Sequence, residues 1–203
     1  DHALHLGKRR FLAELPTGTG KTDVICQQLK RLIEADGALS AKIAGGELVL
    51  TALANQQPFE VNAVYASPLV RCSRLAHALG LGEVQLDHRL MELHFGDWEM
   101  QPWDSIPRDI FDVWANDYAN LSPPNGETFS QLHLRAKSFV EDVSTRSHGA
   151  EVAVVTHGGV IRAILADVLN MPLKGLFRMV IDHASVTQIS FNDEIPRIHF
   201  VNR

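Results

Sequence analysis

The sequence has few cysteines and no long apolar run. It contains two cysteines, Cys26 and Cys72, whose spacing fits neither a metal-binding motif nor a disulfide framework. No apolar run approaches the ~18 residues of a membrane-spanning helix. The opening residues, DHALHLGKRR, lack the pattern of a secretory signal. We therefore expect a cytoplasmic protein with no membrane partner, no bound metal and no cofactor.

An excess of basic residues is also lacking. The formal net charge is −5 at pH 7, which argues against nucleic acid as a partner. Hydrophobic residues make up 45% of the chain and charged residues 21%, as in an ordinary soluble globular protein. The length predicts one domain over residues 1–203, in which residues 7–35 form an atypical segment described below.

A strand, a tight turn and a helix are predicted over residues 151–169. Residues 152–155 form a short apolar run, typical of a buried strand in a parallel sheet covered on both faces. His157 follows this run, and Gly158 and Gly159 lead into a helical pattern. Ligands bind at such strand ends in open α/β sheets, and helix N–H groups attract anions. A lone histidine more often caps a turn, but this setting favours a functional role. The apolar helical positions are Val160, Ile161, Ile164, Leu165, Val168 and Leu169.

A second candidate site is the glycine-rich run PTGTGKT at residues 16–22. Glycines let backbone N–H groups wrap a phosphate, a lysine reaches the outer phosphates, and a threonine hydroxyl can hold Mg²⁺. Residues 7–35 resemble motif I of superfamily 2 helicases and restriction-enzyme motor subunits. The chain shows no acidic Mg²⁺ motif on a second strand, so an amphipathic helix after a glycine-rich turn is the simpler interpretation. The candidate nucleotide-binding residues are Gly18, Gly20, Lys21 and Thr22.

Two further residues have unusual settings. Arg71 is expected in the first helical turn after a strand at residues 61–66. A cation there opposes the helix dipole unless an anion is held nearby. Glu92 lies in an apolar and aromatic stretch, which favours a protonated carboxyl group suited to general-acid catalysis. The simpler alternatives are a surface arginine and a glutamate at the edge of a loop.

Other elements follow from periodicity and end signals. A helix is expected over residues 47–55, and closing strands over residues 185–191 and 197–201. Thr128 and Gln131 have capping-box spacing at the start of another helix. The three tryptophans are interpreted as packing residues: Trp98, Trp103 and Trp114.

Four blocks of sequence occur in the order found in the histidine phosphatase superfamily. They are ASPLVRC at 66–72, MELHFGDWE at 91–99, PPNGETF at 123–129 and VVTHGGVIRAIL at 154–165. Residues 36–203 resemble this superfamily, and most of all its alpha-ribazole phosphatase branch, which is related to the cofactor-dependent phosphoglycerate mutases. The resemblance implies a three-layer α/β/α fold and a hydrolase of phosphomonoesters.

The resemblance also assigns roles to individual residues. Arg71 would bind the phosphoryl group of the substrate, and Glu92 would protonate the leaving alcohol. His157 would stabilise the transferring phosphoryl group, with Gly158 in the same phosphate site. The implied partner is a small phosphomonoester or an inorganic oxyanion, and alpha-ribazole 5′-phosphate of cobalamin biosynthesis is the first candidate.

The family's signature Arg-His-Gly, which carries the nucleophilic histidine, is missing from the sequence. His5 lies within a predicted strand at residues 3–6, and the helicase-like segment stands where the catalytic loop belongs. We therefore expect a phosphatase scaffold whose activity is crippled or lost. The alternatives are an active phosphatase with an unorthodox nucleophile and an NTP-binding P-loop module.

Overall fold

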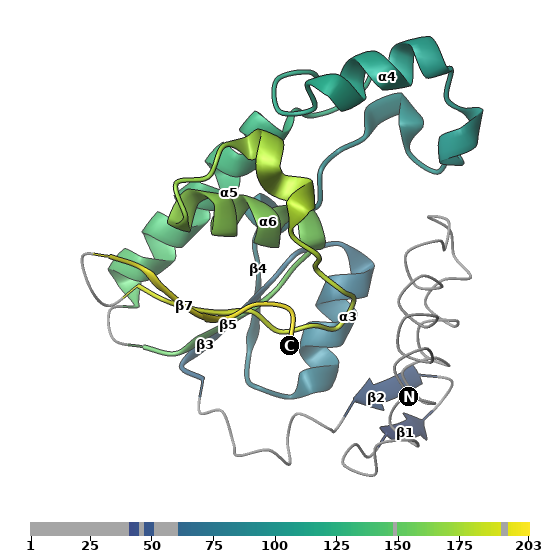
Figure 1. The fold of residues 1–203 in the computed structure, drawn as a ribbon. Helices are drawn as coiled ribbons and strands as arrows, with labels where there is room; N and C mark the ends of the chain where they lie inside the picture. The colour runs from purple at the N-terminus through teal and green to yellow at the C-terminus, as the bar shows by residue number, and fades with distance from the viewer. Residues whose placement is uncertain (1–40, 45–46, 51–60, 148–149, 192–194) are drawn as a thin grey trace, which may run out of the picture. The chain divides into compact units, whose positions relative to one another are not determined.

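The computed structural model describes residues 41–44, 47–50, 61–147, 150–191 and 195–203 (Figure 1). The chain divides into two compact units, one made of residues 1–86 and 150–155 and the other of residues 87–149 and 156–203. The P-loop-like segment at 7–35 and the predicted strand with His5 lie outside the described residues. The expectation of a single domain stays a prediction.

An antiparallel pair of strands occupies part of the region where a helix was expected. β1 (Ala41–Ala44) pairs with β2 (Glu47–Leu50), and Ala41 lies opposite Leu50. The helix predicted over residues 47–55 is therefore wrong at its start. The physical reason is that a short apolar run such as Leu48 to Leu50 fits a strand and a helix equally well by periodicity.

A parallel sheet forms the centre of the first unit. Its strands are β3 (Ala63–Ala66), β4 (Val84–Leu86) and β5 (Val152–Val155), in the order β4-β3-β5. The predicted strands at β3 and β5 are confirmed. β5 is less buried than expected, since Val154 is 38% exposed.

Helix α3 (Val70–Leu79) connects β3 to β4 and contacts all three strands of this sheet. Its buried residues are Cys72 and Ala76, one helical turn apart on the face toward the sheet. The helix ends at Gly80, whose φ of 63° is left-handed and whose N–H donates to the His77 carbonyl over 3.2 Å. The glycine suits this end because it adopts a positive φ without a steric penalty.

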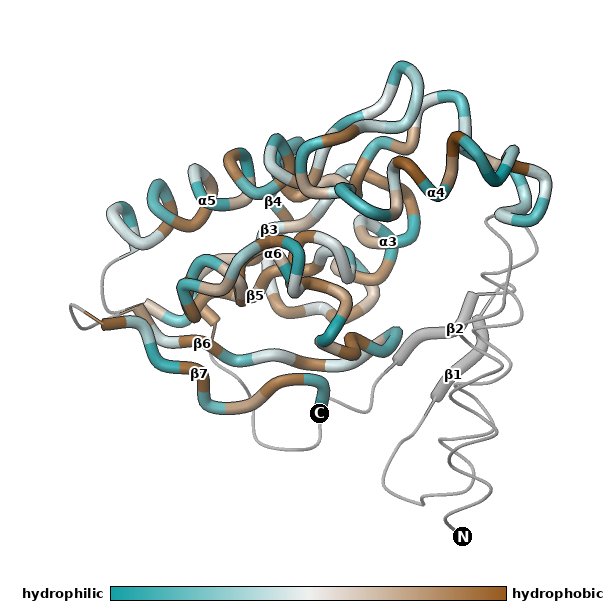
Figure 2. The backbone as a smooth tube through the Cα atoms, turned by 45° about the horizontal axis from the view of Figure 1, so that its top comes forward, coloured by the Kyte–Doolittle hydropathy of each residue, from teal (hydrophilic) through white to brown (hydrophobic). Residues whose placement is uncertain are grey.

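Two packed helices form the centre of the second unit. α5 (Phe129–Arg146) lies beside α6 (Gly158–Val168) in both views of the chain (Figures 1 and 2). The 3₁₀ turns η2 (His88–Leu90) and η5 (Leu173–Arg178) pack on α5 and α6 respectively. Apolar residues recur along α5 between polar ones (Figure 2). The buried residues of α5 are Phe129, Leu132, Ala136, Phe139 and Val143.

The start of α5 and the closing strands agree with the sequence. The Gln131 N–H donates to Thr128 Oγ1 over 3.1 Å, and the Thr128 N–H donates to Gln131 Oε1 over 2.8 Å. This is the predicted capping box. β6 (Gln188–Ser190) and β7 (Arg197–Phe200) pair antiparallel, as expected from the residues at 185–191 and 197–201. None of the described helices is both long and apolar enough to cross a bilayer.

An aromatic cluster gathers around η3 (Gly96–Trp98), η4 (Trp103–Ser105) and α4 (Arg108–Asn116). The ring centroids of Trp98 and Trp114 are 5.5 Å apart at an interplanar angle of 85°, an edge-to-face contact. Both rings are buried, which confirms their predicted packing role. Trp103 also joins the cluster but remains half exposed.

Candidate functional site

His157 lies between a strand and a helix, as predicted. β5 ends at Val155 and α6 begins at Gly158, so His157 is the residue that precedes the helix. Its backbone is extended, with φ −116° and ψ 160°, and its carbonyl accepts the first turn's hydrogen bond from the Ile161 N–H over 3.0 Å. The residue is buried, with 6% of its surface exposed. As the residue that precedes α6, His157 stands at the positive end of the helix.

Glu92 reaches the same helix start from a distant part of the chain. Its Oε2 accepts a hydrogen bond from the Gly159 N–H over 3.3 Å, and its Oε1 accepts one from the Leu93 N–H over 2.9 Å. A Cβ placed on Gly159 would overlap the Glu92 carboxylate. Gly159 is therefore needed for a close approach between side chain and helix. The structure thus brings Glu92 to the turn that follows His157.

Arg162 is a cation of this region that the sequence analysis did not single out. Its Nε donates to the Met179 carbonyl over 2.9 Å, and its guanidinium lies 5.8 Å from the centre of the Phe177 ring. Burial lowers the pKa of Arg162, and the Glu92 carboxylate opposes that shift. The available signal was its spacing of four residues from Gly158, which places both on one helix face.

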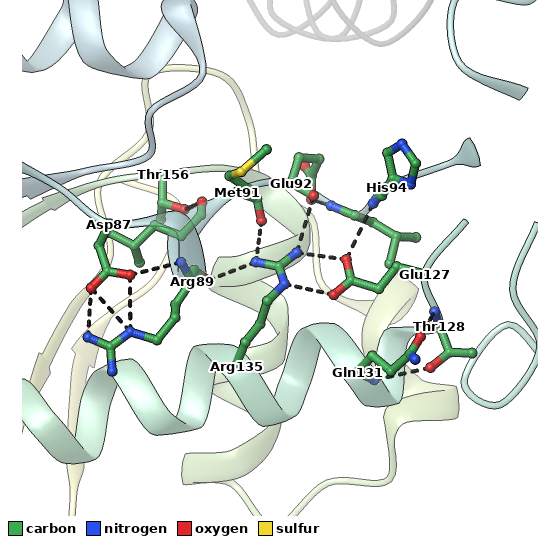
Figure 3. Close-up of polar contacts among 12 residues, drawn as sticks. Asp87, Arg89, Met91, Glu92, His94, Glu127, Thr128, Gln131, Arg135 and Thr156 are labelled. Carbon is green, nitrogen blue, oxygen red and sulfur yellow. Dashed lines mark hydrogen bonds and ion pairs between the residues drawn. The ribbon is translucent and has the colours of Figure 1, made fainter. Parts of the chain in front are cut away.

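Hydrogen bonds join two of the sequence blocks, MELHFGDWE at 91–99 and PPNGETF at 123–129. The Glu127 N–H donates to the His94 carbonyl over 2.8 Å, and the Asp97 N–H donates to the Pro124 carbonyl over 2.9 Å. Gly96 has a φ of 54°, and a Cβ there would overlap the Pro124 carbonyl oxygen. The loop that carries Glu92 is therefore tied to the segment that leads into α5 (Figure 3).

The other predicted site residues are placed as follows. Arg71 is exposed in the first turn of α3, directly after β3, as expected. It belongs to the first unit, whereas Glu92 and His157 belong to the second, and each unit is described by itself. The four candidate nucleotide-binding residues lie outside the described residues: Gly18, Gly20, Lys21 and Thr22.

The chemistry of the second unit suits proton transfer and anion binding. A carboxyl group and an imidazole flank the start of α6, where helix N–H groups favour negative charge. A positioned carboxyl group can act as a general acid. Across the described ranges, no group of three or more His, Cys, Asp or Glu side chains is arranged to hold a metal ion.

Comparison with known proteins agrees with this arrangement. The model of the histidine phosphatase superfamily (branch 1) matches residues 44–203. The adenosylcobalamin/alpha-ribazole phosphatase of Escherichia coli K12 is 29% identical over 146 residues, which cover 66% of this chain and 72% of that protein. The corresponding enzyme of Salmonella typhimurium LT2 is 26% identical over 170 residues, which cover 81% of this chain and 83% of that protein.

A solved structure leads to the same family. A mycobacterial glucosyl-3-phosphoglycerate phosphatase in complex with VO₃ has a TM-score of 0.62 and 26% identity, and the match covers 70% of this chain and 77% of that one. The expected fold class, an α/β fold of the histidine phosphatase type with a parallel sheet and helices, is confirmed. Because the family model matches most of the sequence, the chain belongs to the histidine phosphatase superfamily.

Proposed function

We propose that this chain binds the phosphoryl group of a small phosphomonoester at the start of α6 and hydrolyses the ester slowly. The observation that carries the proposal is the hydrogen bond from the Gly159 N–H to the Glu92 carboxylate, two residues after His157. A substrate phosphoryl group bound at this helix start would lie at the turn that also holds the Glu92 carboxyl group. That arrangement suits acid-assisted cleavage of a phosphate ester.

The roles of the residues follow from their chemistry and from the family resemblance. Glu92 protonates the leaving alcohol, and His157 stabilises the phosphoryl group during its transfer. Gly158 adds a backbone N–H at the positive end of the helix. Arg71 binds the phosphoryl oxygens, because its planar guanidinium offers paired donors that match a tetrahedral anion.

The slow rate follows from the missing Arg-His-Gly. A nucleophile splits one difficult displacement into two easier steps. Loss of the central nucleophile costs several orders of magnitude in rate, about 10⁶ in a well-studied protease. The remaining groups bind the ester and stabilise charge, but they do not form the covalent intermediate. An unorthodox nucleophile would be the alternative, and it predicts an ordinary turnover.

The substrate class is a phosphomonoester of a small alcohol. The relatives support this class. The enzymes of Escherichia coli and Salmonella typhimurium are named for alpha-ribazole, and the mycobacterial enzyme is named for glucosyl-3-phosphoglycerate. Alpha-ribazole 5′-phosphate is the first substrate to try. The complex of the mycobacterial enzyme with VO₃ further supports binding of an inorganic oxyanion by this chain.

Hydrolysis of a generic aryl phosphate tests the proposal. We expect the full chain to turn over far below ~1 s⁻¹, the lower end of the usual enzyme range. A variant that carries Arg-His-Gly directly after Leu6 should be faster, and Glu92→Gln in that background should slow the hydrolysis of an alkyl phosphate, whose leaving group needs a proton. A turnover of about 1 s⁻¹ or more by the unmodified chain would refute the loss of the nucleophile.

The P-loop-like segment leads to a separate outcome. If Gly20, Lys21 and Thr22 formed a working nucleotide site, Mg²⁺-dependent ATP hydrolysis would be measurable and Lys21→Ala would abolish it. We expect neither, because no residues that would complete the Mg²⁺ site and position the water follow the motif in sequence. An ATPase rate that depends on Lys21 would favour the NTP-binding module.

A further inference from the structure

The side chain of Arg135, on α5, binds the backbone of the loop that carries Glu92. An arginine has five N–H donors in a planar fork. In Arg135, Nε donates to Glu127 Oε1 over 2.7 Å and Nη2 donates to Glu127 Oε2 over 2.8 Å. Nη1 donates to the carbonyls of Arg89 and Met91, over 2.7 and 2.6 Å, and Nη2 also donates to the Glu92 carbonyl over 3.2 Å. All five N–H donors of Arg135 thus bind either the Glu127 carboxylate or the backbone carbonyls of residues 89, 91 and 92 (Figure 3).

Among the backbone carbonyls of residues 89–92, that of Leu90 is bound by a residue next to His157. Thr156 Oγ1 donates to the Leu90 carbonyl over 2.8 Å. The carbonyls of residues 89 to 92 therefore all accept hydrogen bonds from side chains. Because Thr156 directly precedes His157, the same contacts that order the Glu92 loop connect it to the residue beside the imidazole (Figure 3).

The loop needs these partners because it has no regular structure of its own. Residues 91–95 are neither helix nor strand, yet Leu93 is 2% exposed, and Leu90 at the end of η2 is 0% exposed. Backbone carbonyls in such a place must find a partner within the protein. The guanidinium takes the role that a neighbouring strand would have in a sheet. The bidentate Arg135–Glu127 pair, with side chains 21% and 17% exposed, holds the fork in its plane.

We propose that Arg135, supported by Glu127 and Thr156, is the positioning residue for the acid Glu92. The inference rests on the proposed function of Glu92 in proton transfer. The guanidinium binds the Glu92 carbonyl at one end of the residue, and the Gly159 N–H binds its carboxylate at the other. Arg135 fixes the peptide from which the acid reaches the start of α6, and it touches neither substrate nor reacting atoms.

The test exploits the different needs of two leaving groups. An alkyl phosphate releases a poor leaving group that needs a proton, whereas 4-nitrophenolate leaves without one. In the full chain, Arg135→Lys should slow alkyl phosphate hydrolysis on the order of 10²-fold, the effect of a misplaced catalytic group, and leave KM nearly unchanged. Hydrolysis of 4-nitrophenyl phosphate should change several-fold less. Equal slowing of the two esters would overturn the proposal.

A double variant separates positioning from general loss of structure. Glu92→Gln should show the same dependence on leaving group, and Arg135→Lys added to it should cost little more, because the two residues act through one proton transfer. Additive losses would overturn the proposal. Arg146→Lys is the matched control, because Arg146 lies on the same helix, its side chain is 71% exposed, and its Nε lies 2.8 Å from Asp142 Oδ1. It should leave both esters unchanged.

A measurement without substrate keeps the proposal independent of the activity. The Gly159 amide resonance in an NMR spectrum of the full chain reports the Glu92 carboxylate directly. Arg135→Lys should shift it in the direction of the Glu92→Gln spectrum, and Arg146→Lys should not. If Arg135→Lys fails to fold, Thr156→Val removes one carbonyl contact at nearly the same volume and should give a smaller shift. An unchanged Gly159 resonance would overturn the positioning role. If Glu92→Gln changes neither ester, the proposed function fails while this readout still decides the positioning.

Discussion

The Glu92 carboxylate occupies the space where a side chain at Gly159 would begin, and the Gly159 N–H donates to it over 3.3 Å. A carboxylate that meets a helix start in this way is held by a backbone donor and by the positive end of the helix dipole. The contact joins two blocks that are far apart in the sequence, MELHFGDWE and VVTHGGVIRAIL. It also explains why a glycine stands in the first turn of α6, where alanine would favour the helix more strongly.

Gly159→Ala should therefore displace the acid without unfolding the helix. Gly159 does not have a positive φ, so alanine can adopt its backbone conformation. The added methyl group would push the Glu92 carboxylate away, and hydrolysis of an alkyl phosphate should fall by about 10²–10⁴, the usual contribution of a general acid. Steady-state kinetics measure the rate, and circular dichroism checks that helix content is retained. Wild-type rates in a folded Gly159→Ala protein would contradict the role of Glu92.

Oxyanion binding should depend on Arg71 and not on Lys21. A hydrogen bond to a charged group contributes ~1.5–3 kcal/mol, so Arg71→Ala should weaken vanadate or phosphate binding by about 10- to 100-fold. We expect the unmodified chain itself to bind at about millimolar strength, since a histidine and an arginine of the family's pocket are missing and each would supply a bond of that kind. The His157 imidazole resonance follows the titration. Loss of binding in Lys21→Ala with full binding in Arg71→Ala would place the phosphate site in the glycine-rich segment.

The contact between α5 and α6 should make the protein sensitive to acid. Burial alone would raise the pKa of Asp167, but the hydrogen bonds from Lys137 Nζ and His133 Nε2, over 3.1 and 3.0 Å, hold it below the ordinary value of 3.8. A folded pKa below the unfolded one adds stability that is present above pH ~3.8 and is lost as the pH falls through the folded pKa. Asp167→Asn should flatten the loss of stability between about pH 5 and the acid end of the range.

Urea unfolding at a series of pH values measures this effect. Its size should be modest, because the Asp167 side chain is 35% exposed and solvent screens the pair. Asp112→Asn is the control, since that carboxylate lies 3.9 Å from Arg108 on an exposed surface, where ion pairs contribute little. The same acid dependence in wild type and Asp167→Asn would show that the linkage lies elsewhere.

The capping box of α5 should contribute measurably to stability. Thr128→Ala removes the acceptor of the Gln131 N–H and should lower the free energy of unfolding by about 1 kcal/mol. Thr145→Ala on the same helix is a matched control, because Thr145 lies in an exposed last turn and alanine is the better helix former. Chemical denaturation compares the two variants. Equal stability of both would mean that packing alone determines where α5 begins.

Local chemistry was enough to predict many elements of this protein. A short apolar run followed by His-Gly-Gly predicted β5, the turn and α6, and Thr128 with Gln131 predicted the start of α5. Each of these signals depends only on residues close together in the sequence, so it can be recognised without knowledge of the tertiary structure. The helix predicted over residues 47–55 shows the limit, because a short apolar run is compatible with both a strand and a helix and its pairing with β1 decides the outcome.

The contacts of the second unit were decided only by tertiary structure. No local pattern indicates that Arg135 binds the carbonyls of Arg89, Met91 and Glu92, because a backbone carbonyl is the same group in every residue. The need for glycine at position 159 is equally invisible, since it arises from a side chain in another block. The sequence by itself determined which groups are present and where helices and strands start. Packing of α5 against α6 decided which of those groups meet. Such contacts join residues far apart in the sequence, and no repeating sequence pattern predicts them.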